Sequence, residues 1–314
     1  MGAHKESVVS KWLVGLTLLA AGAMILAMLA PTGPTSVTVA ATGPISLNKT
    51  GGVTGTTTSA GVATTPANRP GWKLVWADEF DTPGLVDPKK WEYEEGFLRN
   101  RELQYYTRAR KENCRVENGT LILEARKESY TPARGKPANY TSASIHTQGK
   151  ASWLYGRIEM RAKLPQGKGT WPAFWTLGVQ GGWPSCGEID IMEFVGYEPA
   201  KVYSTLHWNA GGHKSKGGSQ PVNQPWADFH VYAVEWSADK IDSYYDENKY
   251  SSIPLSSTES GGDSAFRKPH YIKLNFAFGG DWGAAKGVDD SVLPQKYIID
   301  YVRVYEKIAG AAAK

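Results

Sequence analysis

Short stretches that alternate apolar and polar side chains recur along the chain from Gly71 to about Lys307, separated by turn residues. Stretches of this kind, enriched in β-branched and aromatic residues, occur at 121–125, 155–164, 229–236 and 297–305. A period of two is the pattern of a β-strand with one buried face, and no long segment has the period of an amphipathic helix. Roughly 240 such residues fit one domain. We therefore expect an all-β fold of two packed antiparallel sheets.

The N-terminus has a different character. Lys5 and Lys11 precede an uncharged, mostly apolar run from Trp12 to Ala30. A basic segment followed by an apolar one is typical of a secretory signal peptide, and this run also approaches the roughly 18 residues that span a membrane. We expect residues 1–40 to be a signal peptide or an N-terminal membrane anchor. In either case the domain that follows is exported, to the periplasm or as a secreted, extracellular protein.

Residues 41–70 are rich in Thr, Gly and Ser and hold almost no aromatic or charged side chains. Such a segment cannot bury enough apolar area to offset the entropy lost on ordering. We expect a flexible linker at 41–70, one folded domain at 71–308 and a disordered tail at 309–314.

The net charge of the folded region narrows the choice of partner. The chain carries 35 Lys+Arg and 31 Asp+Glu, but residues 1–70 hold most of the excess and leave 31 basic and 30 acidic residues in 71–314. A nearly neutral domain argues against a nucleic-acid or polysulfated partner, and we expect a monomer. Cys114 and Cys186 match no metal-ligand spacing and favour buried free thiols over a disulfide.

Three carboxylates lie close together in the segment 187–196, which reads Gly-Glu-Ile-Asp-Ile-Met-Glu-Phe-Val-Gly. Alternation along a strand places Glu188 and Asp190 on one face, whereas the odd separation turns Glu193 to the other. A β-bulge at residues 191–192 would return Glu193 to the face of Glu188. Carboxyl groups brought to about 5–5.5 Å have the spacing of a retaining glycosidase, and Asp190 between them would adjust both pKa values.

Two other interpretations of this segment stay open on the pattern alone. A half-exposed strand can carry acidic residues on its wet face, although three carboxylates on one face repel one another. Three carboxylates can also bind a divalent cation. The 12 Trp and 16 Tyr of the chain favour a sugar-binding groove, because exposed aromatic rings pack against the apolar face of a pyranose.

With these residues in place, the sequence resembles glycoside hydrolase family 16, and within it the bacterial laminarinase-like branch. Glu188, Asp190 and Glu193 match the family pattern Glu-x-Asp-x-x-Glu, and Met192 is the extra residue that the lichenase branch lacks. The resemblance extends from about Trp72 to Glu306. Its further matching stretches are 76–81, 100–107, 155–165, 171–177, 206–208 and 300–305.

The resemblance implies a curved β-sandwich of the jelly-roll, concanavalin A-like type, with a groove on its concave face. It implies a retaining endo-β-1,3-glucanase that hydrolyses β-glucan polysaccharides through a covalent glycosyl-enzyme intermediate and needs no cofactor for catalysis. Glu188 would be the nucleophile, Glu193 the acid/base and Asp190 the assisting residue. A glucan transglycosylase and a non-catalytic glucan-binding domain share the fold, and retention of both glutamates argues against the second.

The resemblance also implies substrate-binding residues. Trp171 and Trp175 match groove tryptophans, Asn100 matches a sugar-contacting asparagine, and His207 is expected on a neighbouring strand close to Glu193. The alternatives are core packing for the tryptophans, a turn role for the asparagine and a structural role for the histidine.

Two further features come from the same resemblance. A structural Ca²⁺ away from the groove would be held by Glu79, the backbone carbonyl of Gly119 and Asp300, since oxygen ligands suit this ion; the alternative is an exposed acidic strand end. Arg101 and Ser144 stand where the family often has Asn and Arg, so the groove departs from the family pattern there.

Overall fold

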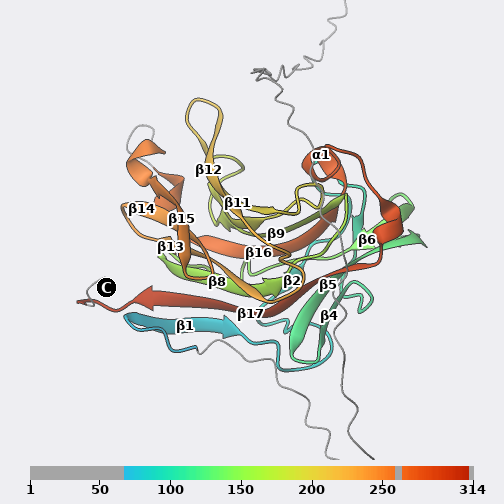
Figure 1. The fold of residues 1–314 in the computed structure, drawn as a ribbon, viewed down its shortest axis with the longest axis horizontal. Coiled ribbons are helices and arrows are strands. Elements are labelled where there is room, and N and C mark those ends of the chain that lie inside the picture. Colours follow the sequence, from blue (N-terminus) through green and yellow to red (C-terminus); the bar gives the residue numbers. More distant parts are fainter. Residues whose placement is uncertain (1–66, 259–263, 311–314) are drawn as a thin grey trace, which may run out of the picture. The chain divides into compact units, whose positions relative to one another are not determined.

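Two β-sheets lie face to face in the computed structural model, which describes residues 67–258 and 264–310 (Figure 1). The strands of the larger sheet are β1 (Trp72–Asp78), β3 (Tyr105–Tyr106), β4 (Cys114–Glu117), β5 (Thr120–Tyr130), β6 (Ala138–Ser142), β8 (Gly156–Lys163), β13 (His230–Trp236), β14 (Lys240–Tyr245), β15 (Asn248–Pro254) and β17 (Gln295–Lys307). Their order is β15-β14-β13-β8-β17-β5-β6-β3, with β1 beside β17 and β4 beside β5. The pairs within this sheet are antiparallel, except that β3 pairs with β6 in parallel.

The smaller sheet carries the features that matter most for function. Its strands are β2 (Glu92–Tyr93), β7 (Ser144–His146), β9 (Thr170–Gly178), β10 (Glu188–Glu193), β11 (Lys201–Asn209), β12 (His213–Pro221) and β16 (His270–Phe278). They follow the order β12-β11-β10-β9-β16-β7-β2. In Figure 1, β9, β16 and β11 lie above β8 and β17 of the larger sheet.

Helical structure is confined to short turns in the described residues. These turns are η1 (Leu255–Ser257), η2 (Ala265–Arg267), α1 (Gly280–Gly283) and η3 (Asp290–Val292). In this part of the chain no helix is long and apolar enough to cross a membrane. The expected signal peptide or anchor at 1–40, nearly all of the expected linker, and residues 311–314 lie outside the described residues.

The core lies between the sheets, and the alternation of side chains explains how it forms. In β11 the side chains of Val202, Leu206 and Trp208 are buried, whereas Tyr203 and His207 on the alternate positions are only partly buried. Each fully buried large apolar side chain contributes roughly 1.5–3 kcal/mol to folding. One face of the strand therefore stabilises the sandwich and leaves the other face free for a site.

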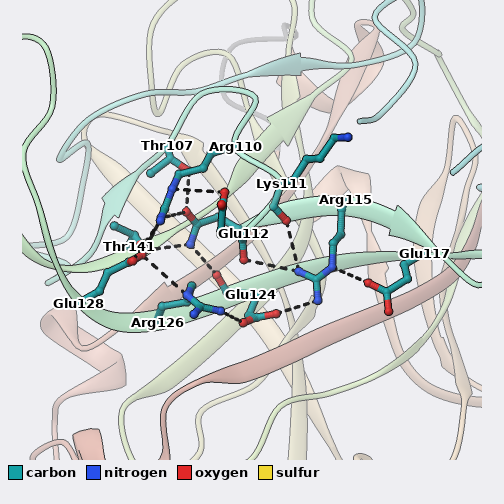
Figure 2. Close-up of polar contacts among 11 residues, drawn as sticks. Thr107, Arg110, Lys111, Glu112, Arg115, Glu117, Glu124, Arg126, Glu128 and Thr141 are labelled. Atoms are coloured by element: carbon teal, nitrogen blue, oxygen red, sulfur yellow. Dashed lines mark hydrogen bonds and ion pairs between the residues drawn. The ribbon is translucent and has the colours of Figure 1, made fainter. Parts of the chain in front are cut away.

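A network of ion pairs and hydrogen bonds ties β4, β5 and β6 together (Figure 2). Glu124 is 3% exposed and accepts from Arg115 at 2.9 Å and from Arg126. Arg110 pairs with Glu128 at 2.6 Å. A buried carboxylate is tolerated only when it is paired in this way, so we assign this network a structural role.

The sandwich agrees with the fold that the alternation and the resemblance predict. β5, β8, β13 and β17 cover the four alternating stretches to within a few residues at each end. Cys114 and Cys186 are both buried and free, as their spacing indicates.

Candidate active site

The central strand β10 contains the bulge that the odd spacing of its carboxylates predicts. Against β11, Asp190 lies opposite Thr205, but Glu193 lies opposite Tyr203, so one residue of β10 is left over. Ile191 and Met192 are both buried in the core. Two adjacent side chains that point into the core return the next one to the outer face.

A cleft of about 870 Å³ lies over the outer face of β10 and its neighbours. Glu188, Asp190 and Glu193 all line it. Asn100, Trp171, Trp175 and His207, the four predicted substrate-binding residues, line it as well. The fold thus brings together residues from four segments that are distant in the sequence.

Glu193 is the carboxyl group best suited to exchange a proton at neutral pH. Loss of hydration in the cleft raises its pKa to about 7, and the nearby charge of Glu188 adds to this effect. The indole N–H of Trp171 donates to Glu193 Oε1 at 3.1 Å and works in the opposite direction. A group with a pKa close to neutral can both donate and accept a proton, as an acid/base catalyst must.

Glu188 and Asp190 differ in what surrounds them. Burial raises both pKa values, and for Asp190 the adjacent charges of Glu188 and Glu193 raise it further, to well above its usual range. Glu188 is helped to ionise by hydrogen bonds from Asp190 and from Trp183, whose Nε1 donates to Glu188 Oε2 at 2.7 Å. Asp190 therefore stays neutral and donates to Glu188, which is the most readily ionised of the three.

His207 lies beside Asp190 and Glu188, so the expectation that it approaches Glu193 is wrong. It is opposite Glu188 in the sheet, and its Nε2 is 3.2 Å from Asp190 Oδ2. Its Nδ1 lies 2.8 Å from Nε2 of His213. Burial, with a smaller effect of His213, lowers the pKa of His207 to about 4, so the imidazole is neutral at pH 7.

The two predicted tryptophans occupy different environments. Trp171 is partly exposed, hydrogen bonds to Glu193 and meets the ring of Trp282 edge-on at 5.6 Å. Trp175 is 8% exposed, and its Nε1 donates to Asn275 Oδ1 at 2.7 Å. Lys273 Nζ lies 4.4 Å from the centre of the Trp175 ring. Trp175 thus lines the cleft mainly as a packed side chain.

Asn100 is held in place by its backbone. It has a φ of 53°, a left-handed conformation that asparagine tolerates better than most residues. Its carbonyl accepts from the N–H of Asp281 at 2.8 Å. Gly280 allows this contact, because a Cβ at that position would lie 2.9 Å from the Asn100 carbonyl oxygen. The turn beside α1 therefore positions the segment that carries Asn100.

Several cleft residues were missed at the sequence level: Arg99, Trp183, Tyr203, Lys273 and Trp282. Trp183 is 54% exposed and lies in the Gly- and Pro-containing turn just before Glu188, a signal that could have been recognised. Lys273 is a charged residue in a mostly apolar strand, which is also a usable signal. Arg99 carries no local signal, because only the fold brings it to the cleft.

The predicted calcium ligands meet at one edge of β17. β5 pairs along this edge as far as Leu121 opposite Ile299, and β1 continues along it from Asp78 opposite Val302. The start of β5, with Gly119 just before it, and the end of β1, with Glu79 just after it, therefore converge beside Asp300.

The side chains fit a calcium ion only in part. Both carboxylate oxygens of Glu79 accept from Arg303 at 2.7 Å, so this side chain is not available to an ion. Asp300 pairs with Arg161 through Oδ2 at 2.6 Å. Gly119 and Asp300 remain suitable oxygen donors. Among the described side chains, a group of three potential metal ligands occurs at Glu188, Asp190 and His207, within the cleft itself.

A proton-donating carboxyl and an ionisable carboxyl that share one face of a sheet, in a cleft lined with aromatic rings, define a glycosidase-type site. Comparison with known proteins agrees. Residues 101–303 match the model of Glycosyl hydrolases family 16, and the chain belongs to this family.

Several of the most similar proteins are described as β-glucanases or laminarinases. The chain is 47% identical over 250 residues to a β-glucanase of Rhodothermus marinus, an alignment that covers 75% of this chain and 86% of the relative. The solved laminarinase from Rhodothermus marinus has a TM-score of 0.70 and 46% identity, covering 77% of this chain and all of that one. A non-specific endo-β-1,3(4)-glucanase solved with 1,3-β-D-cellobiosyl-glucose at its active site has a TM-score of 0.71 and 43% identity, covering 78% and 100%.

Proposed function

We propose that the protein is a retaining endo-β-1,3-glucanase that also tolerates mixed β-1,3/1,4 chains. The observation that carries the proposal is the bulge in β10, which sets Glu188 and Glu193 on one face with Asp190 between them. The raised pKa of Glu193, about 7, supports its assignment as the acid/base. The described activities of the relatives support the substrate class.

In the first step the ionised Glu188 attacks the anomeric carbon of the bound sugar. Glu193 donates its proton to the glycosidic oxygen as the bond between that oxygen and the anomeric carbon breaks. The shortened chain leaves with a neutral hydroxyl group. The remaining sugar is now esterified to Glu188, as a covalent glycosyl-enzyme intermediate.

In the second step the ionised Glu193 accepts a proton from a water molecule, whose oxygen attacks the anomeric carbon. The ester bond to Glu188 breaks, and the product has the same configuration as the substrate. Asp190 and Trp183 both donate to Glu188. These donors stabilise the negative charge that Glu188 carries before attack and regains on release.

Digestion of laminarin tests the proposal. An endo enzyme yields a ladder of short oligosaccharides from the outset, whereas immediate release of glucose alone would identify an exo enzyme. Proton NMR of the early products of a β-linked oligosaccharide should show β-configured ends. Early α-configured ends would mean inversion and would refute the roles of both glutamates.

We propose also that the domain is exported. Lys5 and Lys11 followed by the apolar run 12–30 support this, and a polysaccharide too large to enter a cell must be cut outside it. Fractionation of cells that express the chain with and without residues 1–40 tests the proposal. Activity that remains in the cytoplasm with the full chain would contradict it.

We propose further that a calcium ion bound by Asp300 and the carbonyl of Gly119 stabilises the domain. The convergence of β1, β5 and β17 at this point supports the proposal. A ligand that binds only the folded protein raises its melting temperature, so a chelator is the direct test.

A further inference from the structure

The cleft extends to both sides of β10. On the side of β11 and β12 it is lined by His207 and His213. On the side of β9 and β16 it is lined by Glu94, Arg99, Trp175 and Lys273, which we call the cationic arm. The proposed mechanism uses none of these four side chains directly.

Arg99 is held rigidly in the cationic arm. One of its terminal nitrogens, Nη2, donates to Glu94 Oε2. Its guanidinium lies 5.6 Å from the ring centre of Tyr106 and 5.3 Å from that of Trp175. A planar guanidinium between two rings and a carboxylate has little freedom to reorient.

Glu94 is the anchor of this arrangement. Besides Arg99 it accepts from Lys273 Nζ at 2.7 Å and from Ser144 Oγ at 2.6 Å. These partners hold the pKa of Glu94 down to about 2, against the opposing effect of burial. The carboxylate is therefore ionised at any working pH and keeps both cations in position.

The other terminal nitrogen of Arg99, Nη1, has no hydrogen-bond partner within the described residues, although it is buried. The side chain as a whole is 19% exposed and lines the cleft. A buried donor without an acceptor is costly. An acceptor oxygen of a bound molecule beside Nη1 would relieve that cost.

The charges of the arm favour a neutral ligand. Arg99 and Lys273 carry two positive charges, Glu94 balances one, and the ionised Glu188 faces the surplus, since both cations favour its charged form. An anionic ligand would lie close to two carboxylates. A sugar hydroxyl accepts a hydrogen bond from an arginine without adding charge.

Aromatic stacking is a weaker alternative for this arm. The Trp175 ring is 8% exposed, and Lys273 and Arg99 both lie against it. Polar contacts are therefore the main means by which the arm can hold a sugar.

We propose that Arg99 is a substrate-binding residue that donates from Nη1 to a hydroxyl oxygen of the glucan segment lying over β9 and β16. This inference rests on the proposed function and adds a residue that determines affinity and product size.

The experiment compares Arg99→Met, Arg99→Lys and Arg101→Met. The resemblance places Arg101 at the groove, but its side chain is 86% exposed, pairs with Asp281 and is not among the residues that line the cleft, so it is the matched control. For each variant KM and kcat are measured on laminarin, and binding of laminaritetraose is measured by calorimetry in a Glu193→Gln background. Arg99→Met should raise KM and the dissociation constant about 10- to 100-fold, the loss expected for one hydrogen bond to a charged donor.

Arg99→Lys separates hydrogen bonding from charge. Lysine keeps the positive charge but loses the planar fork, so we expect it to remain at least about tenfold weaker than the wild type. Arg99→Met should still fold, because Lys273 and Ser144 continue to pair with Glu94. If Arg99→Met does not fold, Arg99→Lys provides the test instead. Arg101→Met should retain the affinity of the wild type.

Any one of five outcomes would overturn the inference. Affinity unchanged in Arg99→Met, or fully restored in Arg99→Lys, would show that Nη1 does not bind the sugar. A loss of equal size in Arg101→Met would point to a general disturbance of the segment. A wild type that prefers sulfated laminarin, with the preference lost in Arg99→Met, would make the ligand anionic. Inactivity of the wild type on laminarin would instead refute the proposed function, and this inference with it.

Discussion

The carboxyl group of Glu193 should make the protein less stable as the pH rises, and Glu193→Gln should remove this effect. The folded protein raises the pKa of Glu193 from 4.5 to about 7. Between these values the unfolded chain releases the proton and the folded protein keeps it. The unfolded state then binds fewer protons, so the free energy of unfolding falls as the pH rises and is lowest above pH 7.

The size of the effect follows from the shift. A change from 4.5 to about 7 corresponds to roughly 3 kcal/mol at about 1.4 kcal/mol per unit. Glu193 is partly exposed and Glu188 lies close to it, so solvent screening and the response of Glu188 reduce the effect to about 1–2 kcal/mol. Glu193→Gln should therefore match the wild type near pH 4 and exceed it by about 1–2 kcal/mol at pH 8.

Urea unfolding followed by tryptophan fluorescence at several pH values measures this difference. Glu306→Gln, which removes an exposed carboxyl at the end of β17, is the control for a simple change of charge. A constant difference between Glu193→Gln and the wild type from pH 4 to pH 8 would refute the reasoning, because it would mean that the fold does not perturb this carboxyl group.

Three further predictions concern the same molecule. Glu193→Ala should lose roughly 10²- to 10⁴-fold in turnover, and Glu188→Ala at least as much. With an activated β-glycoside as substrate, added azide should yield the α-glycosyl azide from Glu188→Ala and the β-glycosyl azide from Glu193→Ala. The reverse pattern would exchange the two roles. Activity should fall as the pH rises through about 7, where Glu193 loses its proton. Trp171→Phe removes a hydrogen bond that favours the ionised form of Glu193, so the pH at which activity falls should be higher in this variant. An unchanged pH profile would argue against the Trp171 contact. Excess chelator should lower the melting temperature and added Ca²⁺ restore it, with Asp300→Asn insensitive to both; a melting temperature that chelator leaves unchanged would contradict the calcium site.

Much of the fold and the centre of the site could be predicted from the sequence, because both depend on local periodicity. The alternation of side chains follows from the geometry of an extended chain, so the strands could be located without knowledge of their neighbours. The five-residue separation of Glu188 and Glu193 conflicts with that alternation. A bulge at 191–192 resolves the conflict, and β10 has one there.

The partners of these residues depend on which strands become neighbours, and no local pattern encodes that choice. The resemblance predicted His207 on a neighbouring strand close to Glu193, but the sheet register places it opposite Glu188. Lys273 reaches Glu94, and through it Arg99, only because β2, β7 and β16 are adjacent in one sheet.

The protonation of the site was also decided by the tertiary structure. Glu188 and Glu193 are the same residue type with the same intrinsic pKa. Their roles differ because their surroundings shift the two pKa values differently. Burial raises both pKa values, but that of Glu188 is lowered again by hydrogen bonds from Asp190 and Trp183 and by the positive charge of Lys273, whereas that of Glu193 is lowered mainly by the Trp171 indole. Hydration and neighbouring charge are properties of the folded cleft, so the sequence alone determined which groups can react, and the tertiary structure decided which of them holds the proton.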